Sequence, residues 1–571
     1  GMHHTALLVE AQCETASELD DRVDALSRVV ARLEGLSTLE KPYGFSTDPS
    51  ERALAWLVRK GLYTAVAGAR PVGSTALLED VVVPMPALTD TVGEIQGLCG
   101  RYGYHDAVIF GHAKDANLHF MINPDLRDPS QLDSYERFSD ELVDLILAAD
   151  GSLKAEHGTG RIMAPFVERQ YGTELYQVMR EVKALFDPAG VLNPGVIITD
   201  DAQLHLRNIK VPEVVDPDVD RCVECGYCEP VCPSRDLTTT PRQRIALMRE
   251  LRASDAVRRA ALEADFTYDA VETCAADSLC LLNCPVSIDT GKVMKKFRHD
   301  NQSQVAQDVA LKLAENWAVV LKGLRTGMGV ATLVPSPALT AVTDAARKLV
   351  STDLMYRVGD DLPRGGVPRK TRYRREPGEV VLFASCLNEI FGSATASRRD
   401  KHSGAPFAFL ALCDRAGVKA QIPEGIEGLC CGTVWRSKGL TDGLAEMAER
   451  TASVLIEATH GGEVPVVTDA SSCTHGLHGL ASDLVKAGKT DLAERFAAVP
   501  IVDSVAFTAL TLPPHLRVPR KLGSAVLHPT CSDRHAGDLP HLVACAQACA
   551  ERIVVPDAAG CCAFAGDRGM L

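Results

Sequence analysis

The 571-residue sequence lacks three features that would each point to a class of protein. It has no run of about eighteen apolar residues, so no segment is expected to span a membrane. Basic residues are not in excess, since the formal net charge is −15, and a nucleic-acid partner would need clustered positive charge. No signal peptide precedes its 19 cysteines, so a framework of extracellular disulfides is not expected.

The cysteines instead gather in spacings typical of metal ligands, which favours a reducing cytoplasm. Peripheral attachment to the inner face of the membrane stays open. The length predicts roughly three or four domains, each with its own core.

A cysteine motif near the middle of the chain carries the most specific signal. Residues 221–233 read RCVECGYCEPVCP, and the spacing C-x2-C-x2-C-x3-C-P is formed by Cys222, Cys225, Cys228 and Cys232. A loop with this spacing gives three thiolates to one 4Fe-4S cluster and the fourth to its neighbour. Residues 273–285, TCAADSLCLLNCP, repeat the frame with Asp277 where a second cysteine is expected.

If each motif gives its last cysteine to the cluster of the other motif, the spacing predicts the ligands of two clusters. The first would be bound by Cys222, Cys225, Cys228 and Cys284. The second would be bound by Cys232, Cys274, Asp277 and Cys280. A carboxylate oxygen can bind iron, but the alternatives are a solvent-facing Asp277 beside an open iron, or a single-cluster protein. A zinc ribbon is the alternative for the cysteines as a whole, although it usually has two CxxC pairs without the final C-x3-C-P.

The first 205 residues alternate strand and helix patterns, which predicts an α+β layer arrangement. Strands are expected over residues 6–12, 75–84 and 106–123, and helices over residues 17–36, 49–60 and 90–103.

Two stretches of this region carry candidate chemistry. GHAKDANLHF contains His112 and His119, and GSLKAEHGTGR contains Glu156 and His157. Two imidazoles and one carboxylate with an open fourth position suit a catalytic divalent ion, with zinc as the first candidate. The alternative is that the histidines are hydrogen-bonded structural residues.

Together with LFDPAGVLNPGVI, these stretches resemble the C-terminal, substrate-side domain of the FAD-linked oxidases of the vanillyl-alcohol-oxidase superfamily. GSLKAEHGTGRIMAPFVE is especially similar to the large bacterial FAD and iron–sulfur D-2-hydroxyglutarate dehydrogenases, relatives of D-lactate dehydrogenase and the glycolate oxidase subunits. The resemblance implies that His112, His119 and Glu156 bind the divalent ion. It further implies that His157 takes the proton of the substrate's 2-hydroxyl while hydride leaves for the flavin, and that Asn193 lies near the flavin.

Arg59 and Arg70 are candidates to clamp a substrate carboxylate, because guanidinium binds carboxylate in a bidentate way. Solvated surface charge is the alternative for both. The sequence departs from the family at Lys114 and Ala116, where glycines are usual, so the turn between the histidines is expected to differ. The family's flavin domain, with its glycine-rich phosphate loop, is not found. The chain is therefore predicted to be a portion that does not hold FAD by itself.

The order of motifs predicts an α+β multidomain protein. Residues 1–205 would be the substrate-side domain, 206–300 an α-helical ferredoxin, and 301–378 a helical connector with a basic linker.

Residues 379–571 repeat a strand that ends in a cysteine, EVVLFASC in the first copy and SAVLHPTC in the second, and a pair of adjacent cysteines follows each, which predicts two α/β units with parallel sheets. This pattern resembles the tandem cysteine-rich (CCG) domain of heterodisulfide reductase and glycolate oxidase iron–sulfur subunits, which implies a non-cubane iron–sulfur cluster or a face towards an electron acceptor. Adjacent cysteines rarely pair with each other as a disulfide, and the alternatives in the first copy are a structural or vestigial role and a metal cluster. Its candidate ligands are Cys386, Cys430, Cys431, Cys473, Cys531, Cys561 and Cys562.

These expectations combine in a flavin- and iron–sulfur-dependent D-2-hydroxyacid dehydrogenase, with D-2-hydroxyglutarate as the first candidate substrate and D-lactate as the second. Electrons would pass from FAD through the 4Fe-4S clusters to a quinone or a carrier protein, and an oligomer is expected. The rival is an electron-transfer iron–sulfur subunit, which would have no use for His112, His119 and Glu156. A third alternative is a fragment whose ferredoxin part folds but does not turn over.

Overall fold

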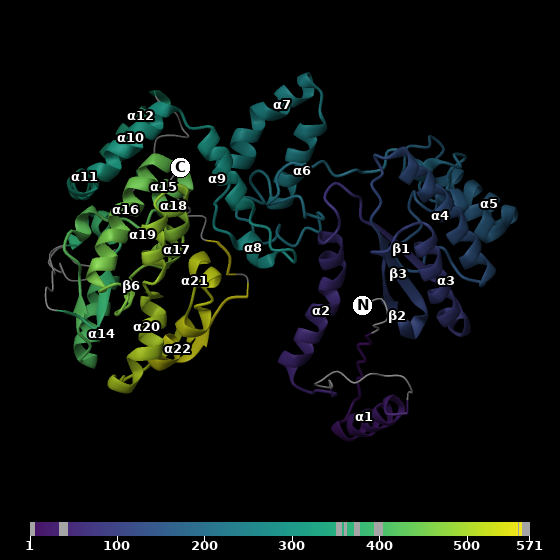
Figure 1. Cartoon of the computed structure of the whole chain (residues 1–571), viewed down its shortest axis with the longest axis horizontal. Coiled ribbons are helices and arrows are strands. Elements are labelled where there is room, and N and C mark those ends of the chain that lie inside the picture. The colour runs from purple at the N-terminus through teal and green to yellow at the C-terminus, as the bar shows by residue number, and fades with distance from the viewer. Residues whose placement is uncertain are drawn as a thin grey trace. The chain divides into compact units, whose positions relative to one another are not determined.

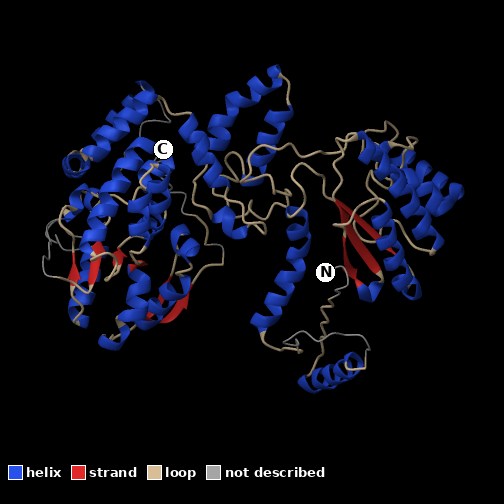
Figure 2. Cartoon of the chain, viewed as in Figure 1, coloured by secondary structure: helices blue, strands red, loops and turns tan. Residues whose placement is uncertain are grey.

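The computed structural model describes residues 6–32, 44–349, 357–358, 363–369, 377–392, 404–557 and 559–561. The chain separates into two compact units, Gly1–Val214 and Val215–Leu571. Figure 1 labels their elements, and Figure 2 colours them by type. Every described helix falls short of the length and apolarity that a membrane span requires.

Two capped helices begin the first unit. α1 (Ala16–Val30) starts after Thr15, whose hydroxyl accepts a backbone N–H of the first turn. α2 (Pro49–Gly68) starts after Asp48, which caps it in the same way, and proline occupies its first position. α1 follows the expected helix up to its last turn, and residues 33–36 of that prediction lie outside the described residues.

A three-stranded antiparallel sheet forms the centre of the first unit. Its order is β1-β3-β2, with β1 Leu77–Val82, β2 Val108–His112 and β3 Asn117–Ile122. The helices α3 (Leu88–Arg101) and α4 (Pro129–Ala148) pack on one face of it. That core includes Val81, Ile95, Phe120, Phe138 and Leu142. Because side chains alternate along a strand, the residues between these point to the opposite face.

One strand prediction was wrong in this unit. Residues 6–12 form no strand within the described structure, and their apolar side chains lie exposed without a sheet edge to join. The strand expected over residues 106–123, with a turn between the histidines, is the hairpin of β2 and β3, which the 3-10 turn Ala113–Asp115 closes. Ala116 follows this turn with φ 51, the left-handed conformation that glycine favours. The last helix of the unit, α5 (Val167–Phe186), kinks at Gly172.

Residues 215–300 of the second unit are helical where they have regular structure, as the ferredoxin prediction required. The helices are α6 Pro241–Ala253, α7 Ala256–Phe266, α8 Leu279–Asn283 and α9 Thr290–Asp300, with a π-helical turn at Thr267–Glu272. A capping box of Thr240 and Gln243 starts α6. The core of this part includes Val219, Ile245, Phe266, Val293 and Met294.

Three helices follow in the expected connector: α10 Gln304–Glu315, α11 Trp317–Ala331 and α12 Ser336–Leu349. The basic linker is described only in part, because residues 370–376 lie outside the described residues. Arg369 in this segment is buried and donates to the carbonyl oxygens of Ala384 and Leu429. Its side chain therefore belongs to the core of the following region.

The remaining residues form two parallel sheets, as the alternation of strands and helices predicted. The larger sheet has the order β5-β4-β6-β7, with β4 Val380–Phe383, β5 Ala420–Gln421, β6 Val466–Thr468 and β7 Ile501–Asp503. The smaller sheet pairs β8 Leu522–Val526 with β9 Ala550–Val554. The fully buried β4 is a continuous apolar run, which is typical of a parallel strand covered on both faces.

Helices cover these sheets (Figure 1). Those of the larger sheet are α13 Leu387–Ile390, α14 Ala405–Ala416, α15 Thr433–Lys438, α16 Thr441–Ala458, α17 Ser471–His478, α18 Leu480–Lys486, α19 Thr490–Ala497 and α20 Ser504–Thr511. Those of the smaller sheet are α21 Cys531–Ala536 and α22 Leu539–Cys549. Cys386 follows β4 and Cys473 lies just beyond β6, so both cysteines stand at the carboxyl edge of the sheet, where α/β proteins place ligands.

Candidate functional site

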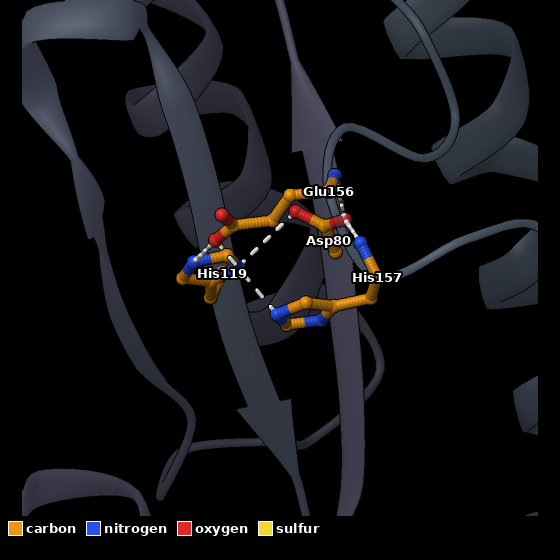
Figure 3. Close-up of side chains that lie close together, drawn as sticks. All are labelled: Asp80, His119, Glu156 and His157. Carbon is orange, nitrogen blue, oxygen red and sulfur yellow. Dashed lines mark hydrogen bonds and ion pairs between the residues drawn. The ribbon is translucent and has the colours of Figure 1, made fainter. Parts of the chain in front are cut away.

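The sheet of the first unit carries a polar cluster on the face away from its helices. Asp80 of β1 is the direct partner of His119 of β3, and His112 of β2 is the partner of Asn117. Paired residues of an antiparallel sheet point to the same side, so these four side chains share one face. Glu156 and His157 reach the same place from the loop after α4 (Figure 3).

Asp80 fixes the position of that loop. Its Oδ2 accepts the backbone N–H groups of Ala155 at 3.0 Å, Glu156 at 2.8 Å and His157 at 2.8 Å. Its Oδ1 accepts the amide of Asn117 at 2.7 Å. Burial acts to raise the pKa of Asp80, but these hydrogen bonds outweigh it and lower the pKa to about 2. Asp80 is therefore a fixed negative charge at the centre of the cluster.

Glu156 is the point on which the imidazoles converge. Its Oε1 lies 2.9 Å from Nε2 of His119, 3.1 Å from Nε2 of His112 and 3.8 Å from Nε2 of His157. The three residues that sequence reasoning chose as metal ligands, His112, His119 and Glu156, are thus brought together. Asp80, which also lies within ligand distance of His119, Glu156 and His157, was missed. The signal that could have revealed Asp80 is its acidic side chain within the mostly apolar strand sequence LLEDVVVP.

The protonation pattern of His119 fits a cation at this place. Burial lowers the pKa of His119, so its imidazole is neutral. Its Nδ1 lies 3.2 Å from Asp80 and its Nε2 lies 2.9 Å from Oε1 of Glu156, so a carboxylate faces each ring nitrogen. A neutral imidazole between two carboxylates fits the carboxylate–histidine–metal arrangement, in which Nε2 and Glu156 would hold the ion.

His157 stands beside this set in a position suited to a proton acceptor. Its ring stacks on His119 with centroids 4.7 Å apart and planes 5° apart, while its side chain remains 40% exposed. Gly158 and Gly160 follow with positive φ, which lets the loop turn directly after the histidine. Lys154 steadies the start of the loop through a buried ion pair of 2.9 Å with Glu79.

The two predicted carboxylate clamps differ in their surroundings. Arg59 donates to the carbonyl oxygen of Gly111 at 3.3 Å and lies over Phe110, so it reaches the strand that carries His112. Arg70 donates to the carbonyl oxygens of Ala67 and Ser74, which occupies two of its nitrogens. The geometry favours Arg59 for contact with a ligand.

Asn193 lies in the segment between α5 and the end of the first unit. It is exposed and has φ 45, and the chain after it is tied to the histidine loop by the N–H of Ile197, which donates to Gly160. Its placement near a flavin stays a prediction.

The cysteines of the ferredoxin part form two groups. Electrostatic contacts link Cys228 with Cys222 and Cys284 in one group, and link Cys274 with Cys232 and Cys280 in the other. These neighbours are compatible with an exchanged fourth cysteine, while the ligand sets of two clusters stay a prediction. Cys225, the remaining cysteine predicted for the first group, is exposed.

Two observations show that these groups fit iron–sulfur clusters. Burial raises the pKa of Cys228 to about 11 and that of Cys280 to about 12, so a cation is needed to hold these thiols as thiolates. Arg244 is buried with Nη1 4.0 Å from the sulfur of Cys232, and its Nε and Nη2 find no hydrogen-bond partner among the described residues. A buried guanidinium with open donors is costly, and an anionic thiolate-bound cluster would satisfy it.

The first CCG copy, built on the larger parallel sheet, brings together the half-buried Cys386 and the buried Cys430, Cys431 and Cys473. Hydrogen bonds connect Cys386 to Cys430, Cys430 to Cys431, and Cys431 to Cys473. Arg369 faces this cluster and its positive charge acts to lower the pKa of Cys386. Four thiols with a buried cation beside them fit a metal cluster, which stays a prediction.

Among the described residues, the cysteines of the second CCG copy, which is built on the smaller sheet, do not belong to this group of four. Cys531 and Cys561 lie with Asp277, and Cys562 is outside the described residues. The sulfur of Cys531 is 3.8 Å from Oδ2 of Asp277. Ligation of the second 4Fe-4S cluster by Asp277 stays a prediction, and the described contact of its Oδ2 is with Cys531.

Comparisons with known families cover the first unit and the start of the second. Residues 2–197 match the family described as FAD linked oxidases, C-terminal domain, and residues 218–288 match the 4Fe-4S dicluster domain. Two stretches of the chain are thus similar to an FAD-linked oxidase C-terminal domain and to a 4Fe-4S dicluster domain. The first stretch contains Asp80, His119 and Glu156, and the second contains both ferredoxin cysteine motifs.

Several curated proteins are similar to the chain. D-2-hydroxyglutarate dehydrogenase of Haemophilus influenzae is 26% identical over 352 residues, which cover 51% of this chain and 34% of that protein. Glycolate oxidase subunit GlcD of Bacillus subtilis is 28% identical over 188 residues, 33% of this chain and 39% of that protein. Mitochondrial D-lactate dehydrogenase [cytochrome] of Arabidopsis thaliana is 30% identical over 154 residues, 27% of each chain. The matched segments thus span well under half of these relatives' own lengths.

Proposed function

We propose that this chain is the substrate-side and electron-transfer portion of an FAD- and iron–sulfur-dependent D-2-hydroxyacid dehydrogenase. The observation that carries the proposal is the convergence of three imidazoles on Glu156 around the fixed charge of Asp80. D-2-hydroxyglutarate is the first candidate substrate and D-lactate the second, because relatives with these names match at 26% and 30% identity.

His112, His119 and Glu156 are the residues that would hold a divalent ion, with zinc as the first candidate. Such an ion supplies Lewis acidity that lowers the pKa of a bound hydroxyl. Asp80 orients His119 and pins the loop that presents Glu156, so the ligands need little reorganisation.

His157 is proposed to take the hydroxyl proton at Nε2, because a neutral imidazole is a suitable base near pH 7. Loss of this proton would let the C2 hydrogen leave with both electrons of its bond as a hydride, and a bound flavin would supply the hydride acceptor. Arg59 is proposed to hold the substrate carboxylate beside His112, and Arg70 to have a structural role.

Electrons would then pass singly through the two 4Fe-4S clusters towards the first CCG copy and a quinone or a carrier protein. Turnover is proposed to require flavin-binding residues beyond those of this chain, with Asn193 near the flavin. A cytoplasmic location, peripheral contact with a membrane and an oligomeric state stay predictions.

The test is calorimetric titration of the full chain with zinc and then with D-2-hydroxyglutarate or D-lactate. His112→Ala and Glu156→Gln are expected to lose both zinc and hydroxyacid binding at this site, whereas His157→Gln keeps the zinc. His105→Ala, a change at an exposed histidine of the same unit, is the matched control and is expected to bind like the unaltered chain. Hydroxyacid binding that is absent, or indifferent to His112 and Glu156, would support the electron-transfer subunit instead.

A further inference from the structure

A group of three side chains in the second unit lies outside the proposed reaction. Asp277, Cys531 and Cys561 come from the second ferredoxin motif and from the second CCG copy, and one ligand atom of each lies within 4.8 Å of the others. We propose that these three residues bind a single thiophilic divalent ion, Zn²⁺ or Fe²⁺, as a site separate from the 4Fe-4S clusters. The site does not depend on hydroxyacid oxidation by the first unit.

Asp277 is held so that one oxygen remains available. Its Oδ1 accepts the backbone N–H of Leu279 at 3.2 Å, which leaves Oδ2 facing Cys531 at 3.8 Å. Ala276 and Ser278 on either side of it both have positive φ, 52 and 58. Ser278 also donates its hydroxyl to Asp289 at 2.8 Å, so the loop is fixed on both sides of the carboxylate.

Both cysteines are held by hydrogen bonds of their own copy. Cys531 follows Thr530, which forms a capping box with Asp533 at the start of α21. The hydroxyl of Thr530 lies 2.8 Å from that of Ser471 in the first copy. On the other side, Arg534 donates to the carbonyl oxygen of Ala559 at 2.5 Å, which holds the segment of Cys561 against α21.

The distances suit one ion rather than a cubane. Zinc bonds of about 2.3 Å to sulfur and about 2.0–2.2 Å to oxygen place neighbouring ligands of a tetrahedron roughly 3.5–3.8 Å apart. The separation of Cys531 and Asp277, 3.8 Å, lies at the upper end of this range. In a 4Fe-4S cubane each ligand binds a different iron, so the ligand atoms must stand further apart than these three.

The donor set selects the ion. Two cysteine sulfurs and one carboxylate oxygen meet here, with Cys531 donating to Oδ2 of Asp277, and a divalent ion would replace this proton and bind the sulfurs as thiolates. Thiolate ligands favour Zn²⁺ or Fe²⁺ over Mg²⁺ and Ca²⁺, which prefer oxygen. Cys531, Cys561 and Asp277 are each partly exposed, so an ion can enter from solvent and a fourth ligand position is open to water.

The test uses the full chain, purified anaerobically and titrated with Co²⁺. Thiolate ligation of cobalt gives a sulfur-to-metal charge-transfer band in the near ultraviolet. Cys531→Ser and Cys561→Ser are each expected to lose this band and one equivalent of bound metal. Asp277→Asn is expected to weaken binding by ten-fold or more while iron and acid-labile sulfide stay at the level of the unaltered chain. Cys549→Ser, at an exposed cysteine of the same copy, should change nothing.

A variant that replaces one ligand by another distinguishes loss of a ligand from loss of folding. Cys531→His should still bind one cobalt ion but shift the band, because an imidazole replaces one thiolate. The proposal is overturned if Asp277→Asn loses iron and sulfide while Cys531→Ser and Cys561→Ser keep theirs, since Asp277 would then be a cubane ligand. It is also overturned if the charge-transfer band is absent or is the same in all variants.

Discussion

Asp80 has the greatest influence of any single residue on the candidate active site. We expect Asp80→Asn to lower zinc affinity by about 10–100-fold, as for other second-layer partners of metal-binding histidines. The amide would present an N–H to backbone N–H groups that now donate to Oδ2, and the negative charge beside Nδ1 of His119 would be lost. Calorimetric zinc titration measures the effect, and Asp115→Asn in the exposed hairpin turn is the control. Equal affinities in the two variants would contradict the role given to Asp80.

A second prediction concerns Asp469, whose carboxylate is buried among groups near the first CCG cysteines. Burial raises its pKa to about 6 from 3.8, although the N–H of Ser385 and the amide of Asn388 act to lower it. The folded protein therefore binds this proton more tightly than the unfolded chain, and stability falls as pH rises from about 4 through 6. The full effect is on the order of 3 kcal/mol.

Thermal unfolding at pH 5 and pH 7 tests this directly. The unaltered chain should be relatively more stable at pH 5, and Asp469→Asn should remove much of that difference because asparagine does not titrate. Asp442→Asn, on the partly exposed start of α16, is the control. A pH difference that survives unchanged in Asp469→Asn would rule out Asp469 as its source.

Asp80 is the residue of the candidate site that could not be predicted from the sequence. His112, His119 and Glu156 stand in distinctive local motifs, and the structure brings them together. Asp80 lies in an apolar strand with no motif of its own, and its role comes from strand register and from three backbone groups of a loop about 75 residues away. Such a role depends on tertiary structure, which spacing does not report.

At the scale of single elements, α6 is the helix that connects the two ferredoxin cysteine groups. Arg249 on it donates to the carbonyl oxygens of Asp220 and Cys222, beside the first group. Arg244 on the same helix faces Cys232 of the second group. We expect Arg244→Gln to make the reduction potential of the second cluster more negative, because a buried positive charge favours the added electron.

A redox titration followed by electron paramagnetic resonance measures the potential of each cluster. Arg252→Gln, at an exposed position of α6, keeps the helix and should leave both potentials in place. If Arg244→Gln shifts neither potential while iron and sulfide are retained, the guanidinium does not act on a cluster.

Element predictions succeeded where the signal was local. The cysteine frames, the parallel strands before Cys386 and the helical ferredoxin all follow from spacing or short periodic runs. The expected strand over residues 6–12 was wrong because an apolar segment becomes a strand only when an edge is available to pair with. The turn expected between His112 and His119 closes the β2–β3 hairpin without glycine, because Ala116 takes the left-handed conformation itself.

At the scale of the whole chain, the two units hold separate cores and separate candidate sites. The core around Phe120 and Phe138 lies entirely in the first unit, and the core around Val219 and Met294 lies entirely in the second. The proposed zinc ligands of the oxidase domain and the ferredoxin cysteines share no element. Ligands of one unit should therefore stabilise that unit without stabilising the other.

Differential scanning calorimetry of the full chain is expected to resolve two transitions. Zinc at about a hundred times its dissociation constant should raise the unfolding free energy of the first unit by about 2.7 kcal/mol, and His112→Ala should abolish this shift. Cys274→Ser should lower only the transition of the second unit, because it removes a ligand buried in that unit's core. A single transition that responds to both substitutions would show that the units unfold as one, and the substrate-side and electron-transfer parts could then not be treated as independent modules.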